Sequence, residues 1–418
     1  MQIQRDEYLN KLIEHKQNGL IKVITGVRRC GKSYLVFRLF KEHLLKEGIG
    51  KDHIIEIVLD DRRFKRLRDP DACLEYVISK AAGPGTYYVL LDEVQLMEDF
   101  EEVLNSFLHM DNVDVYVTGS NSKFLSSDIV TQFRGRGDEI RVYPLNFREF
   151  YSSEKFASAA EAWKEYYTYG GLPFILNLEK EEDKVFYLQR LFKETYLKDI
   201  IDRHHIQNDI QLEELLNIIS SSVGSLTNAN KLANAFKSKE KEELSAPTIK
   251  RYLDYLEDAF IIEKAMRYDI KGKRYINTPY KYYFVDVGLR NARMNFRQQE
   301  ENHIMENIIY NELKVRGFSV DVGIEEINEK DGSGQYSRKQ TEVDFIANKG
   351  SRRYYIQSAY ELSSEERIYK EERPLKAISD SFKKIMVVKD DIMVKRDDSG
   401  IVTIGLLDFL LNKDSLDL

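Results

Sequence analysis

Residues 26–33 of this 418-residue chain read GVRRCGKS, a spacing of glycine, lysine and serine that is typical of a loop for nucleotide phosphates. Gly26 and Gly31 allow the backbone to curl so that its N–H groups face a phosphate chain, which Lys32 also reaches. Ser33 adds a hydroxyl for Mg²⁺. An apolar run precedes the loop, and helix-forming sequence follows it. The predicted nucleotide contacts are Gly26, Val27, Arg28, Arg29, Cys30, Gly31, Lys32, Ser33 and Tyr34.

Two acidic residues follow a second apolar run, about 60 residues after this loop. Tyr87–Leu91 predicts a buried strand, and Asp92 and Glu93 come directly at its end. Ligands of open α/β folds bind at the carboxyl edge of the parallel sheet. Asp92 is therefore predicted to hold Mg²⁺ together with Ser33, and Glu93 to polarise the water that attacks the γ-phosphate.

Polar residues also end the strand predicted over residues 113–122. Ser120 or Asn121 could orient the attacking water, or the segment could simply form a turn with a helix N-cap. Arg134 and Arg136 lie between glycines ahead of a further strand. An arginine on such a loop can reach a phosphate on a neighbouring subunit, and the alternative is a solvated basic loop. The catalytic candidates are Glu93, Lys32, Arg136 and Asn121.

The elements that must position these residues are strands alternating with helices, which predicts an α/β fold with a parallel sheet. An amphipathic helix over residues 4–15 comes first and is expected to pack beside the first strand. Its Arg5 and Tyr8 could border an adenine, although packing and surface charge are the favoured interpretation. The chain is 42% hydrophobic and 32% charged, which is typical of a globular protein. No apolar run approaches the roughly 18 residues of a membrane span, so we expect a cytoplasmic protein without membrane contact.

Two cysteines are too few for a disulfide framework or a zinc site. The net charge of −7 argues against a protein that coats nucleic acid non-specifically, although it leaves local basic patches open.

The middle of the chain carries a pattern that could read DNA. Residues 212–264 predict three short helices, as in a helix-turn-helix, with Lys250, Arg251 and Tyr252 on the exposed side of the third. Three packed helices also occur without DNA. Residues 264–297 then hold nine basic residues, two acidic ones and several tyrosines. This stretch favours either a nucleic-acid surface or a β-wing whose tyrosines are core and whose charges are solvated.

Several motifs together resemble a widespread prokaryotic family of AAA-type ATPases. They are GVRRCGKS, LLDEVQ, VTGSNSKFLSS, RGR followed by VYPLNFREF, and YGGLP. The resemblance covers essentially the whole chain and implies ATP and Mg²⁺ as cofactors. It also implies that Ser120–Asn121 is the sensor region and that Arg136 is the arginine finger. The implied organisation is an AAA+ core at residues 1–155, a helical lid at 156–211, a winged-helix domain at 212–280 and a PD-(D/E)XK nuclease-like domain at 281–418.

The C-terminal region has the order of a PD-(D/E)XK site, with one element missing. Glu306 lies on a predicted helix and Asp344 on a predicted strand, but the ExK of the next strand falls on Gln357-Ser358-Ala359. An amide is a poorer Mg²⁺ ligand than a carboxylate, and a methyl group cannot activate water. We therefore expect a nuclease-shaped module whose site, at Glu306, Asp344, Gln357 and Ala359, is catalytically degenerate.

Two functional classes remain open on the sequence. The first is an ATP-driven motor that binds or remodels DNA, including branched or junction DNA. It would work as a homo-oligomer, such as a hexameric ring, in which Arg136 completes a neighbour's site. The second is an ATP-controlled switch whose C-terminal module binds a protein partner.

Overall fold

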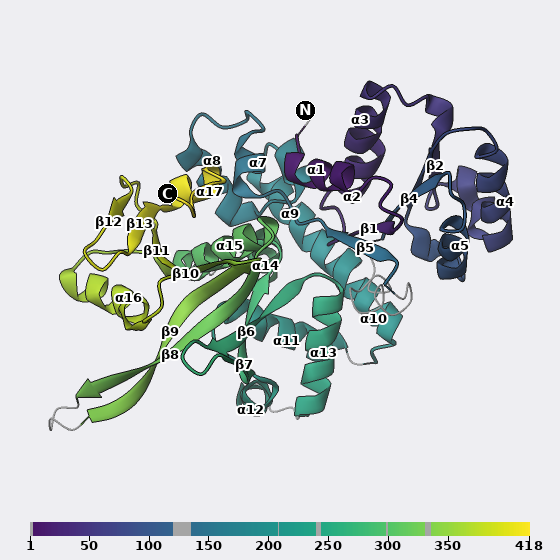
Figure 1. Ribbon diagram of the computed structural model, residues 1–418. Helices are drawn as coiled ribbons and strands as arrows, with labels where there is room; N and C mark the ends of the chain where they lie inside the picture. The colour runs from purple at the N-terminus through teal and green to yellow at the C-terminus, as the bar shows by residue number, and fades with distance from the viewer. Residues whose placement is uncertain (1–2, 120–134, 208, 240–243, 298–299, 331–335) are drawn as a thin grey trace. The chain divides into compact units, whose positions relative to one another are not determined.

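A computed structural model describes residues 3–119, 135–207, 209–239, 244–297, 300–330 and 336–418 (Figure 1). The chain divides into two compact units. Unit 1 comprises residues 1–144 and 258–260, and unit 2 comprises residues 145–257 and 261–418.

A parallel sheet forms the centre of unit 1. Its five strands follow the order β2-β3-β4-β1-β5, and every neighbouring pair is parallel. The strands are β1 (Ile21–Thr25), β2 (Ile54–Val58), β3 (Tyr87–Asp92), β4 (Val113–Thr118) and β5 (Gly137–Arg141). Because the strands run in one direction, the ends of β1, β3 and β4 meet at one edge. The predicted α/β core with a parallel sheet is confirmed.

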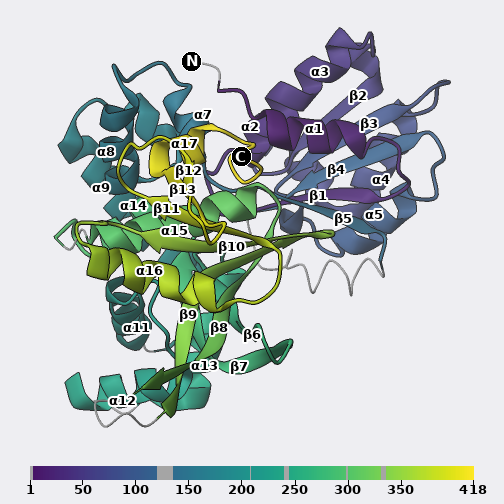
Figure 2. The same cartoon turned by 60° about the vertical axis from the view of Figure 1, so that its left-hand side comes forward.

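Helices cover both faces of this sheet (Figure 2). On one face, α4 and α5 bury Val77, Leu104 and Phe107 against the strands. On the other face, Phe40 lies against Tyr88 and Tyr116 with ring centroids 6.4 and 4.5 Å away. The helices are α1 (Asp6–Glu14), α2 (Lys32–Tyr34), which continues through a π-helical segment (Leu35–Phe40) into α3 (Lys41–Lys46), α4 (Pro70–Lys80) and α5 (Phe100–Phe107).

A charged pair lies inside the central strands of unit 1. Lys22 on β1 is fully buried and forms an ion pair with Asp114 on β4. The second Asp114 oxygen accepts hydrogen bonds from the Tyr116 hydroxyl at 3.0 Å and the Gln17 amide at 3.0 Å. Burial lowers the pKa of Lys22, whereas Asp114 opposes that change. The apolar run predicted at residues 20–25 is therefore interrupted by a paired buried charge.

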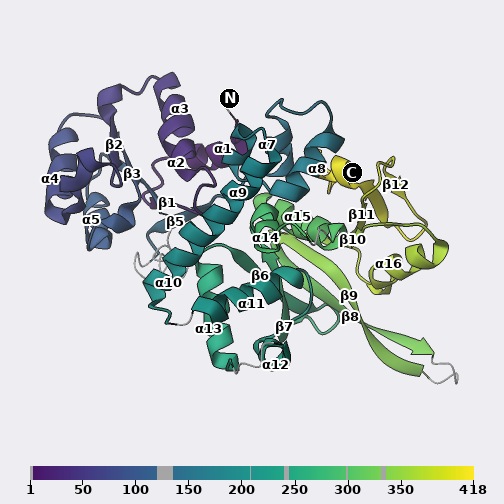
Figure 3. The same cartoon turned by 180° about the vertical axis from the view of Figure 1, so that it is seen from behind.

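Unit 2 combines helices with a second sheet (Figure 3). Eight strands follow the order β12-β13-β11-β10-β9-β8-β6-β7. They are β6 (Ile262–Asp269), β7 (Arg274–Phe284), β8 (Ser319–Lys330), β9 (Tyr336–Lys349), β10 (Arg352–Ala359), β11 (Lys383–Val388), β12 (Lys395–Arg396) and β13 (Val402–Gly405). The strands β8 and β9 run side by side as a long antiparallel hairpin. The domain boundary expected between residues 280 and 281 lies inside β7. The sheet also continues across this boundary, because β6, which forms a hairpin with β7, pairs with β8.

The helices of unit 2 include the three short ones expected after residue 212. They are α7 (Phe147–Tyr151), α8 (Ala159–Tyr169), α9 (Glu181–Leu191), α10 (Lys198–His204), α11 (Asp209–Ser221), α12 (Ala229–Lys239), α13 (Ala246–Asp258), α14 (Val287–Arg293), α15 (Glu301–Val315), α16 (Glu365–Ala377) and α17 (Leu406–Leu411). On α13, Lys250 and Arg251 are exposed as expected, but Tyr252 is only 7% exposed. The exposed position predicted for Tyr252 is wrong because this ring belongs to the apolar face of the helix.

The YGGLP segment is held by an aspartate from another part of unit 2. Asp286 caps α14 by accepting from the Leu289 amide at 3.1 Å, and it also accepts from the Gly171 amide at 2.8 Å. A Cβ at Gly170 would lie 2.2 Å from Asp286 Oδ1, and Gly170 has a φ of +76°. Both facts require glycine at this position. Burial raises the pKa of Asp286 to about 6.

Candidate active site

The phosphate loop leaves β1 and enters α2 as predicted. Gly26 has a φ of +135° and Gly31 a φ of +102°, which glycine adopts readily. The Lys32 side chain is buried, and its ammonium donates to the carbonyls of Gly26 at 2.9 Å and Val27 at 3.1 Å. The loop therefore curls around this cation.

Val142, directly after β5, supports the loop from one side. A Cβ at Gly26 would lie 2.1 Å from the carbonyl oxygen of Val142. The buried Cys30 thiol donates to the same oxygen at 3.3 Å. Arg28 is partly buried, whereas Arg29, Ser33 and Tyr34 are exposed. Of the predicted contact residues, Cys30 thus faces the protein.

Arg5 fixes the loop from the N-terminal side. Its guanidinium is 1% exposed and donates to the carbonyls of Cys30 at 2.8 Å, Tyr143 at 2.8 Å and Pro144 at 3.4 Å. It also lies 4.5 Å from the ring centre of Tyr8, whose hydroxyl accepts from the Tyr143 amide. The packing expected of Tyr8 is therefore confirmed, whereas the surface charge expected at Arg5 is wrong because this guanidinium is buried and bonded to backbone carbonyls.

Asp92, at the end of β3, meets the first turn of the helix that follows the loop. The Ser33 hydroxyl donates to Asp92 Oδ1 at 3.0 Å, and the Thr118 hydroxyl donates to the same oxygen. Asp92 is 6% exposed, and burial raises its pKa. The two predicted Mg²⁺ ligands are thus adjacent, and both offer the oxygen donors that Mg²⁺ prefers.

Glu93 has an unusual backbone conformation, with a φ of +51°. A non-glycine residue in the left-handed region is uncommon and is frequent at functional sites. Its amide donates to Thr118 Oγ1 at 3.3 Å, and its carboxylate accepts from Gln95. Thr118 at the end of β4 therefore links Asp92 and Glu93. The polar residues expected at the end of this strand are Ser120 and Asn121, further along the chain, and the signal for Thr118 is a threonine directly before Gly119.

The remaining candidates are the sensor residues and the arginines of the glycine-rich loop. Ser120, Asn121 and Arg134 lie outside the described residues. Arg136 is exposed, and its carbonyl accepts from the Ile21 amide at 2.9 Å. Because Ile21 begins β1 and the phosphate loop follows its end, Arg136 lies at the opposite edge of the sheet. The distance along a five-residue strand is about 17 Å. The Arg136 backbone therefore lies away from the phosphate loop of its own chain.

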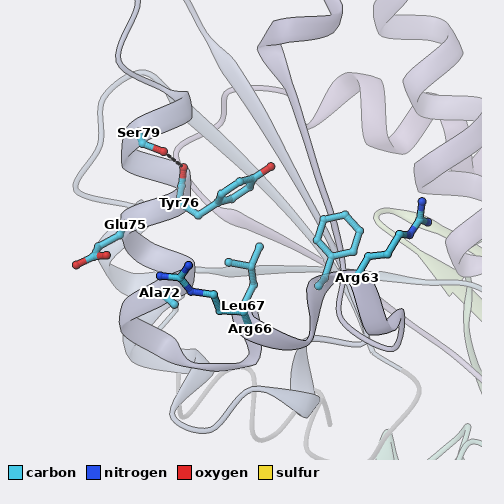
Figure 4. A pocket seen from close by; sticks show the side chains of 8 residues that line it. Arg63, Arg66, Leu67, Ala72, Glu75, Tyr76 and Ser79 are labelled. Carbon is cyan, nitrogen blue, oxygen red and sulfur yellow. Dashed lines mark hydrogen bonds between the residues drawn. The ribbon is translucent and has the colours of Figure 1, made fainter.

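A separate hollow of about 520 Å³ lies elsewhere in unit 1 (Figure 4). A 3₁₀ segment, Arg62–Arg68, and α4 form its walls. Arg62, Arg63, Lys65 and Arg66 of this segment are exposed, and Arg63 donates to Asp61 at 2.5 Å. The residues that line the hollow are Arg63, Phe64, Arg66, Leu67, Ala72, Glu75, Tyr76 and Ser79.

In unit 2, the structure brings together three of the four residues predicted for the degenerate nuclease site. Ser358 donates its amide to Asp344 Oδ2 at 2.9 Å, and the Asp344 amide donates to Gln357 Oε1 at 3.3 Å. Glu306 meets Asp344 through Lys281, which lies 2.8 Å from Glu306 and 3.5 Å from Asp344. Ala359 instead lies in an apolar cluster with Leu375 and other residues.

Two titratable groups of this cluster are strongly perturbed. Burial, together with the Glu306 charge, raises the pKa of Asp344 to about 8. Burial alone would lower the pKa of Lys281, but the carboxylates of Glu306, Asp344 and Glu342 raise it instead. Sequence reasoning counted Lys281 in a basic surface and did not connect it with the acidic residues.

The basic stretch at residues 264–297 is only partly a surface. Lys271, Lys273 and Arg274 are exposed at the turn between β6 and β7. Lys281 is 3% exposed and Arg290 is 1% exposed, with its guanidinium donating to the Ser220 carbonyl at 2.8 Å. Arg267 is also buried, at 9% exposure, so three of the nine cations lie in the interior.

Two properties of the described ranges bear on ligands and membranes. No three histidine, cysteine, aspartate or glutamate side chains of these residues gather so that they could hold a metal ion. Among the helices found there, none combines the length and apolar character that crossing a bilayer requires.

Comparisons with known proteins agree with the site in unit 1. Residues 18–151 match the model of an AAA domain, and residues 160–300 match a domain of unknown function (DUF8612). An uncharacterized protein of Haemophilus influenzae is 33% identical over 98% of both chains. The uncharacterized protein MJ1544 of Methanocaldococcus jannaschii is 29% identical over 92% of this chain and 82% of its own.

Solved structures give weaker matches. A Walker-type ATPase of Pyrococcus abyssi has a TM-score of 0.49 at 14% identity, covering 70% of this chain and 96% of its own. The Aeropyrum pernix ORC1 protein in complex with DNA has a TM-score of 0.29 at 10% identity, covering 70% and 92%. The sequence matches and the phosphate-loop geometry together establish that this chain belongs to the same family as the Haemophilus influenzae protein and carries a P-loop ATPase domain of the AAA type.

Proposed function

We propose that this protein is an AAA+ ATPase that hydrolyses ATP with Mg²⁺ and couples hydrolysis to the binding or remodelling of DNA, including branched or junction DNA. The observation that carries the ATPase part is the convergence of Lys32, Ser33, Asp92 and Glu93 on one edge of a parallel sheet.

The residues of this edge have separate tasks in hydrolysis. Lys32 can exchange its two carbonyl contacts for phosphate oxygens and so bind the β- and γ-phosphates. Glu93 can accept a proton from the attacking water. Thr118 keeps Asp92 and Glu93 in register, because its hydroxyl bonds to both residues. These tasks support a prearranged site in which positioning supplies much of the rate.

The oxygen donors at Ser33 and Asp92 fit Mg²⁺. A hydroxyl and a carboxylate 3.0 Å apart match its preference for oxygen ligands, with ATP phosphates completing the shell. When bound, Mg²⁺ would offset the negative charge that develops on the phosphates.

Two exposed cationic segments support contact with DNA. One is the turn with Lys271, Lys273 and Arg274, which follows the three helices α11, α12 and α13. The adjoining Tyr275 is 53% exposed and could stack on a base. The other is the segment Arg62–Arg68 in unit 1. Phosphates bind such cations irrespective of sequence.

The position of Arg136 supports a homo-oligomer. Since Arg136 lies at the sheet edge away from its own phosphate loop, it can contribute to hydrolysis only in a neighbouring subunit. A closed ring, for example a hexamer, would place one such arginine at every site. An arginine of this kind accelerates phosphoryl transfer by a factor of about 10³ or more.

We further propose the organisation inferred from the sequence, with a winged-helix segment and a nuclease-shaped C-terminal module without nuclease activity. The hairpin of β6 and β7 that follows α13 suits a wing. In the module, Gln357 takes the place of a metal-binding carboxylate, and Ala359 is buried among apolar side chains. Neither residue can activate water.

The decisive experiment is the ATPase rate measured without DNA and with single strand, linear duplex and a four-way junction. We expect DNA, and the junction most of all, to raise the rate. A rate that is unchanged by all three DNAs would refute coupling to DNA.

Charge reversal tests the turn directly. Lys271→Glu with Lys273→Glu should weaken DNA binding and reduce the slope of log affinity against log salt by roughly 2, because each lost phosphate contact removes about 0.9. Lys395→Glu with Arg396→Glu on exposed β12 is the matched control with the same change of charge. Equal effects of both pairs would argue against a specific role of the turn.

One observation favours the alternative, an ATP-controlled switch that binds a protein partner. Lys281 and Arg290 are buried, so the basic surface is smaller than the sequence indicates. The same ATPase experiment separates the two functions, since a switch would ignore DNA.

A further inference from the structure

A single lysine occupies the centre of the nuclease-like cluster. Lys281 on β7 has a side-chain exposure of 4%, and its ammonium lies 2.8 Å from Glu306, 2.7 Å from Glu342 and 3.5 Å from Asp344. These carboxylates come from α15 and β9, so two elements converge on a cation that a third, β7, supplies.

Other donors complete the shell of these carboxylates. The Tyr283 hydroxyl donates to Glu306 Oε1 at 2.7 Å. Asp344 Oδ2 accepts from the Ser358 amide at 2.9 Å. The cluster is thus satisfied by protein groups, whereas buried carboxylates without such partners would require an external cation.

An ammonium and a divalent cation cannot share this position. A divalent metal would require carboxylate oxygens at about 2.0–2.6 Å. No three acidic side chains of the described residues are arranged in this way, so Glu306, Glu342 and Asp344 would have to close on the position that the Lys281 ammonium occupies. The ammonium supplies one charge and three donors, so it can serve the three carboxylates at once. Unlike a metal, it has no free position for a water molecule and cannot lower the pKa of one.

We propose that Lys281 takes the place of the divalent cation in the nuclease-like module and makes the cluster a metal-independent structural centre. The inference rests on the nuclease-shaped module of the proposed function. It goes beyond that function, because it attributes the loss of metal binding to Lys281, which lies outside the ExK position.

The test is Mn²⁺ binding by the nucleotide-free full-length protein, followed by electron paramagnetic resonance and by thermal unfolding. Lys281→Met keeps most of the side-chain stem and removes the charge. We expect this variant to unfold at a lower temperature than the parent without metal, to regain several degrees with Mn²⁺, and to bind Mn²⁺ at least tenfold more tightly than the parent.

The matched control is Lys281→Met combined with Asp344→Asn, in which the gained Mn²⁺ binding should disappear. A gain that persists in the double variant would place the ion elsewhere and overturn the proposal. So would a folded Lys281→Met protein that binds no more Mn²⁺ than the parent.

If Lys281→Met fails to fold, a comparison of the parent protein with Asp344→Asn still tests the proposal. Equal Mn²⁺ binding by the parent and by Asp344→Asn supports a centre without metal, whereas loss of a binding site in Asp344→Asn refutes it. Failure of the proposed DNA coupling is detected separately, by an ATPase rate that does not respond to DNA in the parent protein.

Discussion

Replacing Arg5 with methionine should weaken ATP binding even though Arg5 itself is not one of the predicted nucleotide contacts. The guanidinium joins the carbonyl of Cys30, inside the phosphate loop, to the carbonyls of Tyr143 and Pro144 beyond β5. Methionine has a similar length but no donor. The loop would therefore lose its tether while the space remains largely filled.

The magnitude follows from these contacts. Hydrogen bonds that involve a charged group contribute about 1.5–3 kcal/mol each, and the bond to Pro144 at 3.4 Å is weak. Losing the two bonds at 2.8 Å should cost roughly 3–6 kcal/mol of the free energy of unfolding. Only the Cys30 bond acts on the loop directly. Of the free energy lost with these bonds, we expect roughly 1 kcal/mol to act on ATP binding, which corresponds to a five- to tenfold weaker affinity.

Two measurements check this reasoning, namely denaturant unfolding and titration with a fluorescent ATP analogue. Arg5→Lys should fall between the parent and Arg5→Met, because an ammonium keeps the charge but cannot span the carbonyls as the planar guanidinium does. Arg63→Met, at an arginine whose side chain is 82% exposed, is the control and should change neither quantity. A destabilised Arg5→Met protein that binds ATP normally would refute the tether.

Three further predictions concern the two units. Lys32→Ala should abolish productive nucleotide binding, whereas Glu93→Gln should bind ATP and stall hydrolysis, as equilibrium binding and single-turnover rates will show. A Glu93→Gln protein with the parental rate would exclude Glu93 as the base. Arg136→Ala should bind ATP but hydrolyse it about 10³-fold more slowly, and mixing it with Lys32→Ala should restore part of the activity through hybrid sites. Because burial raises the pKa of Asp286 from 3.8 to about 6, the folded state binds the extra proton, so its contribution to stability is present below about pH 4 and lost as the pH rises through 6. Asp286→Asn should flatten the stability profile over this window by up to about 3 kcal/mol, and an unchanged profile would contradict the assignment.

The sequence was sufficient for those parts of the catalytic site that local chemistry determines. The phosphate loop needs glycine, lysine and serine at fixed spacing. In the structure, the residues from Gly26 to Ser33 form the loop that this spacing predicts. Asp92 could be placed beside Ser33 because parallel strands end at a common edge. Both inferences use only short segments and a general rule of sheet topology.

Residues that act across long separations could not be placed in this way. Arg5 bonds to Tyr143, 138 positions away, and Asp286 bonds to Gly171, 115 positions away. A buried arginine and a surface arginine look alike in a sequence. The DVG pattern at Asp286 indicates a helix cap, but nothing local shows that it also holds the YGGLP turn.

Lys22 was missed for a related reason. Its flanking residues are apolar, and a lysine at the centre of such a run favours a strand edge or solvent. The ion pair with Asp114 permits burial, but that partner lies 92 positions away. The error over Tyr252 is the reverse, since a buried residue was predicted to be exposed. Its ring follows two cations in the sequence and was therefore assigned to their exposed face.

The two acidic centres of this chain differ in what neutralises them, and this difference argues for different uses. At Asp92, the donors are the hydroxyls of Ser33 and Thr118, which carry no charge. A buried carboxylate held only by neutral donors gains from a nearby cation, so this centre suits Mg²⁺. At Glu306 and Asp344, the Lys281 ammonium already supplies the cation. Asp92 is therefore the acidic group that suits a metal ion, whereas Glu306 and Asp344 already have a cation, and this difference supports the proposed ATPase without nuclease activity.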